Sequence, residues 1–131
     1  MFGFVIVSHS EKVAEGIKDV VEQLHGGKSV CVAAGGVDGR IGTNPLKIQE
    51  AIETVQNCEH ILVFVDLGSA VLSTDLAIDL LEDDLRQKVM MVDGPILEGA
   101  VIGVIQASIT DDLAEVLEMI KKSKELVKFS E

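Results

Sequence analysis

Apolar residues in this chain of 131 residues alternate between two arrangements. Uninterrupted runs rich in branched apolar residues occupy residues 2–8 and 61–65, and weaker runs occupy residues 30–34 and 89–92. Runs of this length and composition predict short β-strands that are buried on both faces of a sheet. Four such strands are therefore expected.

Between and after these runs, apolar residues recur at spacings of three and four, which is the period of an amphipathic helix. Three helices follow from three sets of residues: Val13, Ile17, Val20, Val21 and Leu24; Ile48, Ala51, Ile52 and Val55; and Leu72, Leu76 and Leu80. Two more helices are predicted after the fourth strand, at residues 96–107 and 111–127. The whole pattern is strand and helix four times over, followed by a final helix.

Residues at the predicted boundaries are of the kinds that begin and end helices. The segment from Ser8 to Glu11 has the spacing of a capping box. Asn44 precedes Pro45, a residue that suits the first turn of a helix. The sequence His25-Gly26-Gly27 is typical of a helix end.

Strands that alternate with helices predict right-handed crossovers and a mainly parallel sheet with helices on both faces. The expected fold class is α/β, an open three-layer α/β/α sandwich whose four-stranded sheet has the flavodoxin-like order 2-1-3-4. No proline-rich or serine-rich linker and no internal repeat divides the sequence. One domain is therefore expected over residues 1–131.

Charge and composition narrow the classes of partner. The chain carries 11 basic and 22 acidic residues, a net charge of −11 that repels nucleic acid and anionic lipid, and it has no Trp or Tyr to stack on bases. The first residues lack the pattern of a signal peptide, and the longest nearly uncharged stretch, 99–110, is shorter than the about 20 residues of a membrane span. A cytoplasmic protein that binds another protein, and neither nucleic acid nor a membrane, is expected.

The connections that follow the four strands are the expected location of the functional site, because ligands of open parallel sheets bind beyond the carboxyl ends of the strands. These connections span residues 8–10, 35–43, 66–69 and 93–95. The order 2-1-3-4 places the first and third connections side by side. His9 and Asp66 are therefore expected to face each other.

His9 and Asp66 are a pair of residue types suited to phosphoryl transfer. An imidazole with the ordinary pKa of about 6.5 offers a neutral, nucleophilic nitrogen near neutral pH. A carboxylate such as Asp66 accepts the N–H of the other ring nitrogen, selects the tautomer and stabilises the charge that builds on the ring. Gly68 and Ser69 open the next helix and offer amides and a hydroxyl to phosphoryl oxygens. The alternative is that His9 is an ordinary loop residue and Asp66 only caps a helix.

Other histidines and the glycine-rich connection are weaker candidates. His25 lies at a helix end and His60 at a strand start, so neither is assigned a catalytic role. The glycines of residues 35–43 are not followed by the Gly-Lys-Ser/Thr of a P-loop. A flexible loop is the first expectation for this connection, and contact with a partner is the second.

No metal or other cofactor is assigned. Asp38 and Asp93 are single carboxylates in their connections, which is the usual composition of a turn. Cys31 and Cys58 lie in apolar segments without the neighbouring ligands of a zinc site, so they are expected to be buried, reduced thiols.

Three motifs occur in order along the chain: the strand 4–7 with Ser8-His9-Ser10, then Gly42-Thr43, then Val65-Asp66-Leu67-Gly68-Ser69-Ala70. Together they resemble the phosphotransferase subunits (DhaM) of bacterial dihydroxyacetone kinase, a branch of the mannose-type enzyme IIA family. Pro95-Ile96-Leu97-Glu98-Gly99-Ala100 also matches that branch, so the resemblance covers nearly the whole chain.

The resemblance implies a phosphotransferase of glycerol and dihydroxyacetone metabolism. The histidine phosphocarrier HPr would donate a phosphoryl group to this chain, which would pass it to ADP on the nucleotide-binding subunit of the kinase. The family's phosphorylated histidine falls on His9, its orienting aspartate on Asp66 and its Gly-Ser turn on Gly68 and Ser69. Gly42 and Thr43 match the family by motif, and these two residues and Ser10 are further candidates for phosphoryl binding. Relatives form two-fold dimers, so a homodimer is expected, with the helix 96–107 against its twin.

Two departures from the family pattern refine this expectation. Some members carry a fused HPr-like domain, whereas this chain ends at Glu131 and is expected to use a separate HPr. Mannose-transporter relatives have a longer turn of the DxxGGSP type after the third strand. The shorter turn from Asp66 to Ala70, without a proline, favours the dihydroxyacetone branch over sugar uptake.

Three other functions remain open from the sequence. One is the enzyme IIA component of a mannose-type sugar uptake system, and another is a non-catalytic regulatory module of the same fold that senses phosphorylation state. The third is a response-regulator receiver with Asp66 as the phosphate acceptor. A receiver needs an acidic pair after the first strand, where this chain has Ser8-His9-Ser10.

Overall fold

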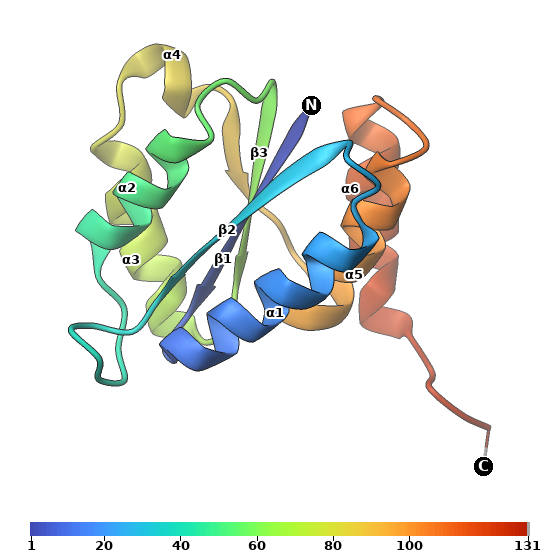
Figure 1. Ribbon diagram of the computed structural model, residues 1–131, viewed down its shortest axis with the longest axis horizontal. Helices are drawn as coiled ribbons and strands as arrows, with labels where there is room; N and C mark the ends of the chain where they lie inside the picture. Colours follow the sequence, from blue (N-terminus) through green and yellow to red (C-terminus); the bar gives the residue numbers. More distant parts are fainter. Residues whose placement is uncertain (131) are drawn as a thin grey trace.

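The computed structural model describes residues 1–130 and places a four-stranded parallel sheet at the centre of the molecule (Figure 1). The strands are β1 (Phe2–Ser8), β2 (Ser29–Gly35), β3 (His60–Val65) and β4 (Val89–Met91). Their order is β2-β1-β3-β4, and each neighbouring pair is parallel. The predicted fold class and strand order are confirmed.

Helices cover both faces of this sheet (Figure 1). One face carries α1 (Glu11–Leu24), α5 (Ile96–Ala107) and α6 (Leu113–Lys122), which continues into the 3-10 turn η1 (Ser123–Glu125). The opposite face carries α2 (Pro45–Thr54), α3 (Gly68–Asp79) and the one-turn helix α4 (Asp83–Arg86). None of the helices within residues 1–130 combines the length and apolar character that crossing a membrane requires.

Alternating side chains of the central strand enter two separate cores, because successive side chains of a strand point to opposite faces. On the α1/α5/α6 side, Phe4 packs against Phe64 with ring centroids 5.7 Å apart and planes nearly parallel. On the α2/α3 side, Val5 and Val7 pack with Val63. All seven residues of β1 are buried, which is why the first apolar run has no polar interruption.

Helix boundaries follow the predicted signals with three differences. Asn44 caps α2 with Pro45 in its first turn as expected, but Ser10, rather than Ser8, caps α1 by accepting the N–H of Val13. The predicted helix over residues 111–127 ends at Lys122 and tightens into η1. The helix α4 has no counterpart in the prediction, since its four residues are too few to show a period.

The leucines that predicted α3 lie on its outer face rather than in the core. Leu72, Leu76 and Leu80 are 67%, 57% and 54% exposed, whereas Ala70 and Ala77 are fully buried. Small residues let α3 lie close to the sheet and to α2, so its inner face is marked by alanine instead of leucine. The leucine spacing predicts the helix, and the structure shows that these leucines mark its exposed face.

The predicted interface helix α5 is packed within its own chain. Gly99, Ala100, Gly103, Val104 and Ala107 are buried, and α5 contacts α1, α6 and the two central strands. A Cβ at Gly103 would lie 3.0 Å from Ile120 of α6, so these two helices approach closely. Leu97 and Ile105 lie on the outer side of α5 and are 40% and 45% exposed. The homodimer stays a prediction.

Candidate functional site

The pairing of β1 with β3 brings His9 and Asp66 together at the carboxyl edge of the sheet. Val7 lies opposite Val65 in the register, so the residues that follow each of them leave the sheet at the same level. His9 N–H donates to Asp66 Oδ2 at 2.9 Å, and the ring atom His9 Nδ1 lies 2.9 Å from Asp66 Oδ1. One carboxylate thus holds both the backbone and the ring of the histidine.

These contacts select one tautomer of His9. An ionised carboxylate can only accept hydrogen bonds, so His9 Nδ1 carries the proton that Asp66 Oδ1 accepts. The lone pair then lies on Nε2, the ring nitrogen directed away from Asp66. The neutral imidazole is therefore oriented as a nucleophile through Nε2.

Asp66 is surrounded by hydrogen-bond donors that keep it ionised. Burial is the largest single influence on this carboxyl and opposes ionisation, but hydrogen bonds from the His9 backbone and ring, from Ser8 Oγ at 2.8 Å and from Leu67 N–H at 2.7 Å outweigh it. Together they hold the pKa of Asp66 below its ordinary value. The site therefore contains a fixed negative charge at neutral pH beside the imidazole.

The start of α3 faces the nucleophilic nitrogen. Ser69 Oγ contacts His9 Nε2, and Gly68 is the first residue of the helix. Leu67 at the N-cap supplies no side-chain acceptor, and amides in a first helical turn have no acceptor within the helix. The N–H groups of Gly68 and Ser69, with the positive end of the helix dipole, make this a favourable location for an anion.

Three other predicted residues lie around this centre in different roles. Ser10 caps α1. The Gly42 N–H donates to His9 O at 2.9 Å, and Thr43 Oγ1 lies 2.6 Å from Ser73 Oγ on α3. The structure therefore groups His9, Asp66, Gly68 and Ser69 directly. As phosphoryl ligands, Ser10, Gly42 and Thr43 remain predictions.

The connection from β2 to α2 contains a β-hairpin. Val37 and Arg40 exchange two backbone hydrogen bonds of 2.8 and 2.9 Å, and Asp38 and Gly39 between them have φ of 49° and 78°. Positive φ at both central residues is the type I′ arrangement for which Asp-Gly is favoured. The glycine-rich connection, for which a flexible loop is the first expectation, contains this turn, and the Asp38-Gly39 pair is the sequence signal for it.

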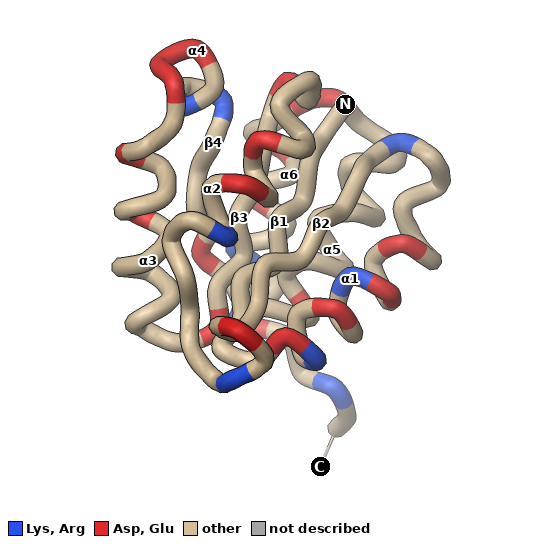
Figure 2. Tube along the Cα trace, turned by 60° about the vertical axis from the view of Figure 1, so that its left-hand side comes forward, with Lys and Arg blue, Asp and Glu red and all other residues tan. Residues whose placement is uncertain are grey.

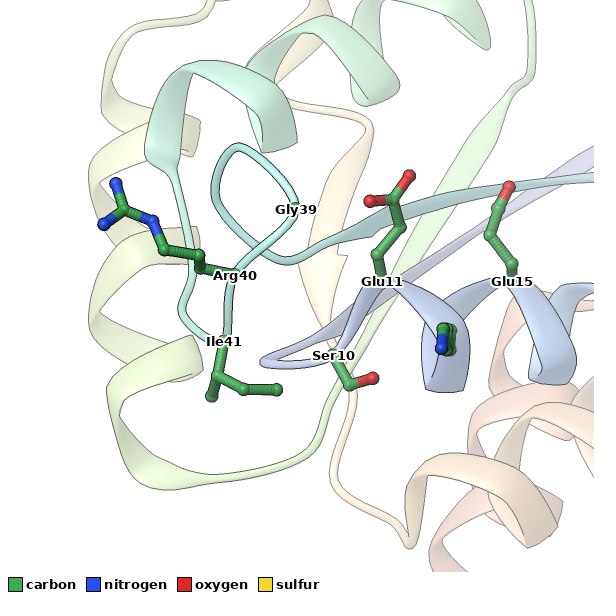
Figure 3. Close-up of a pocket in the computed structure, with 7 residues that line it drawn as sticks. Ser10, Glu11, Glu15, Gly39, Arg40 and Ile41 are labelled. Atoms are coloured by element: carbon green, nitrogen blue, oxygen red, sulfur yellow. The ribbon is translucent and has the colours of Figure 1, made fainter.

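A shallow pocket of about 750 Å³ lies between this hairpin and the start of α1 (Figure 3). Ser10, Glu11 and Glu15 line it from α1 and its cap, and Gly39, Arg40 and Ile41 line it from the hairpin. His9 is not among its lining residues. The His9 ring, whose side chain is 19% exposed, thus lies outside this pocket.

Ser8 is a site residue that the sequence prediction did not include. Its side chain is buried, donates to Asp66 Oδ2 and accepts the N–H of Ser10 at 3.1 Å. The sequence alone indicates only that Ser8 ends a strand or caps a helix. Its location under Asp66 depends on the sheet register.

Replacing Ser8 by alanine is expected to lower the free energy of unfolding by about 1–3 kcal/mol, because the buried carboxylate loses a donor and the Ser10 N–H loses an acceptor. Urea unfolding measures this change. Ser29→Ala is the matched control: its buried hydroxyl, at the start of the neighbouring strand, has no hydrogen-bond partner among residues 1–130. An equal loss in both variants would mean that the Ser8 hydrogen bonds contribute nothing measurable.

The remaining polar candidates lie away from this centre. His25 Nδ1 accepts the N–H of Gly27, and His60 packs against Phe2 at the other end of the strands. Asp93 pairs with Lys124. Cys31 and Cys58 are buried free thiols, as predicted, and burial raises the pKa of the Cys31 thiol to about 12.

Comparisons with known protein sequences all match this chain to components of phosphotransferase systems or of dihydroxyacetone kinases. Residues 3–117 match the EIIA-man family model, described as the PTS system fructose IIA component. A Listeria innocua serovar 6a protein named PEP-dependent dihydroxyacetone kinase 2, phosphoryl donor subunit DhaM, is 38% identical over 90% of this chain and 95% of its own length. The Escherichia coli K12 protein named PEP-dependent dihydroxyacetone kinase, phosphoryl donor subunit DhaM, is 36% identical over 89% of this chain but only 26% of its own length.

Solved structures agree with the observed architecture. A crystal structure of a protein of unknown function superposes with a TM-score of 0.85 at 37% identity, covering 92% of this chain and 93% of that one. The phosphotransferase system component EIIA of Streptococcus agalactiae superposes with a TM-score of 0.69 at 20% identity, covering 95% of this chain and 93% of that one. At that identity the second likeness concerns the fold alone.

Proposed function

Because this chain belongs to the EIIA-man family of phosphotransferase system IIA components, we propose that it is a phosphohistidine carrier of a dihydroxyacetone kinase. In this proposal His9 accepts a phosphoryl group from HPr and transfers it to ADP bound on the nucleotide-binding subunit of the kinase. The names of the Listeria and E. coli relatives support the kinase branch, because both are described as phosphoryl donor subunits.

The single observation that carries the proposal is the state of the His9 ring. Asp66 holds the proton on Nδ1, and the lone pair of Nε2 faces the start of α3. A nucleophile with a fixed tautomer beside a helix N-terminus has the two elements that phosphoryl transfer requires, alignment and stabilisation of negative charge on the phosphoryl oxygens.

In the first transfer, the Nε2 lone pair attacks phosphorus of the donor phosphohistidine. The new N–P bond forms as the donor N–P bond breaks, and the donor imidazole leaves with the bonding electrons. The His9 ring, which keeps its Nδ1 proton, becomes positively charged, and Asp66 stabilises that charge across the 2.9 Å contact. In the second transfer, a β-phosphate oxygen of ADP attacks phosphorus, and the electrons of the N–P bond return to Nε2.

Ser69 has two successive roles in this scheme. In the unphosphorylated site its hydroxyl donates to Nε2 and so occupies the position that phosphorus takes after transfer. When the N–P bond forms, the hydroxyl must turn from the nitrogen to a phosphoryl oxygen. The N–H groups of Gly68 and Ser69 are available to the other oxygens.

A reconstituted relay tests the proposal. The purified chain is mixed with phosphoenolpyruvate, enzyme I and HPr, then separated and added to an ADP-loaded nucleotide-binding kinase subunit. A single acid-labile phosphate on the chain, followed by ATP on the kinase subunit, is the expected result. Labelling without ATP formation would support the carrier function but exclude ADP on this kinase subunit as the acceptor. It would favour a role in sugar uptake or as a regulatory module. Absence of labelling would exclude the carrier function.

A receiver function is disfavoured by the surroundings of Asp66. Both of its oxygens accept hydrogen bonds from protein donors, from Ser8 and His9 on Oδ2 and from His9 and Leu67 on Oδ1. Phosphorylation of this carboxylate would disrupt these bonds. A base-labile adduct that survives loss of His9 would be the sign of such an acyl phosphate.

The surface beside His9 carries exposed leucines along α3, interrupted by the exposed Asp75 and Asp79, and suits a protein donor. Figure 2 shows α3 without charged residues over most of its length, and Leu67, Leu72 and Leu76 are each more than half exposed. Leu67 directly follows Asp66, so this surface is continuous with the reactive ring. We assign it to HPr, which must bring its phosphohistidine to Nε2 from this side.

Leu72→Glu is expected to slow transfer from HPr by about tenfold, since a charge at a desolvated contact opposes docking. Labelling by phosphoramidate, a small donor that needs no docking surface, is expected to be unchanged. Ile109→Glu, an equally exposed position at the opposite edge of the sheet, is the control. Equal HPr rates for Leu72→Glu and the wild type would contradict the assignment of this surface.

A further inference from the structure

The backbone of His9 is held by the connection between β2 and α2. Gly36 N–H donates to Ser8 O at 3.2 Å and Gly42 N–H donates to His9 O at 2.9 Å, so two consecutive carbonyls are bound from one segment. Both glycines have positive φ, 72° and 148°, a conformation that other residues rarely adopt. The connection is therefore shaped to reach these carbonyls.

The segment between the two glycines is folded back on itself. Its Val37–Arg40 hairpin is closed by two backbone hydrogen bonds, and a Cβ at Gly42 would lie only 3.1 Å from Val37. In Figure 3 this hairpin lies beside Ser10, where the chain enters α1. Thr43 directly follows Gly42 in the chain, so a contact that fixes Thr43 also restrains the Gly42 N–H that donates to His9 O.

Thr43 is held by α3. Its Oγ1 lies 2.6 Å from Ser73 Oγ, and Ser73 follows Ser69 by four residues, which places both serines on one face of the helix. Ser69 contacts His9 Nε2. The contacts form a closed circuit from the His9 ring through Ser69, α3, Ser73, Thr43 and Gly42 back to the His9 carbonyl.

We propose that Ser73 is a positioning residue for His9, and that its hydrogen bond to Thr43 sets the separation between the ring nitrogen Nε2 and the start of α3. This inference rests on the proposed function for its consequence in phosphoryl transfer. The Asp66 contact fixes Nδ1 and the backbone of His9, but it does not involve α3 beyond Leu67. The Thr43–Ser73 bond supplies that missing constraint.

The inference also gives Thr43 a different role from direct phosphoryl binding. If Thr43 acts through Ser73, removing either hydroxyl breaks the same bond, and removing both has no further effect. If Thr43 instead binds the phosphoryl group, Thr43→Val and Ser73→Ala have independent effects that combine. The two roles are therefore separable by a double-mutant cycle.

The first test uses ¹⁵N chemical shifts of the His9 imidazole in the unphosphorylated protein, so its outcome does not depend on the proposed activity. In Ser73→Ala, the Nε2 resonance is expected to move toward its position in Ser69→Ala, while Nδ1 stays with the wild type because the Asp66 contact is intact. In Ser73→Thr, which keeps a hydroxyl, the Nε2 chemical shift is expected to match that of the wild type. An Nε2 resonance in Ser73→Ala identical to that of the wild type would overturn the inference.

The second test measures the rate of transfer from HPr. Ser73→Ala and Thr43→Val are each expected to slow it by about three- to tenfold, and the double variant by no more than either one. Thr74→Val is the matched control, since Thr74 is the next residue of α3 and its buried hydroxyl has no hydrogen-bond partner in the part of the chain that the structure describes. Additive effects of the two substitutions, or the same slowing in Thr74→Val, would reject the positioning role.

Discussion

Replacing His9 by alanine is expected to abolish acid-labile phosphate on this chain when phosphoenolpyruvate, enzyme I and HPr are supplied. No other imidazole lies at the carboxyl edge of the sheet among residues 1–130, because His25 follows α1 and His60 begins β3. The measurement is the intact mass of the protein after incubation, read beside the wild type. ATP formation on the kinase subunit is expected to stop with it.

The matched control for this prediction is His25→Ala, which removes an imidazole of the same kind whose Nδ1 accepts a hydrogen bond from Gly27 in a turn. This variant is expected to label like the wild type. Label that survives His9→Ala would mean that another residue carries the phosphate. Loss of label in both variants would point to a general effect on the fold rather than on the nucleophile.

Asp66→Asn is expected to slow phosphoryl transfer by about 10²–10⁴-fold, the scale found when the aspartate of a catalytic histidine is made neutral. The amide removes the charge that stabilises the phosphorylated ring, and its NH₂ group can reverse the tautomer so that the proton occupies Nε2. Single-turnover labelling by HPr measures the rate. Asp93→Asn, which changes the aspartate after β4, is the control and is expected to retain the wild-type rate. A tenfold effect or less at Asp66 would show that its charge is not needed.

The same carboxyl predicts a pH dependence of stability. The folded state lowers the pKa of Asp66, so ionised Asp66 stabilises the fold above its ordinary pKa of about 3.9, and that contribution is lost as the pH falls through the lower, folded value. The unfolding free energy of the wild type is expected to fall more steeply below about pH 4 than that of Asp66→Asn. Urea unfolding at a series of pH values measures both slopes. Parallel slopes would contradict the lowered pKa.

The strands of this fold were predictable because a strand buried on both faces needs apolar residues at every position. That condition leaves a local signal in β1 and β3, both of which pair on two sides. The helix α3 shows the opposite case. Its leucines predict the helix but not which face is buried, because periodicity does not distinguish a core stripe from an exposed one when the buried side consists of small residues.

The reactive pair was predictable for a different reason. Parallel strands end at one edge of the sheet, so polar residues just after the first and third strands meet once the strand order is known. His9 and Asp66 follow those strands directly and needed no knowledge of side-chain packing. The hydrogen bonds of Ser8, Thr43 and Ser73 depend on how the elements pack together, so they could not be predicted.

The sequence by itself determined the fold class, the proposal of His9 as a nucleophile and the pairing of His9 with Asp66. Each of these depends on residue type and on order along the chain. Only the tertiary structure decided which tautomer His9 adopts, which face of α3 meets solvent, and how the β2–α2 connection is tied to Ser73. Those features depend on distances between atoms of segments far apart in the sequence, and such distances exist only once the two cores have packed against the sheet.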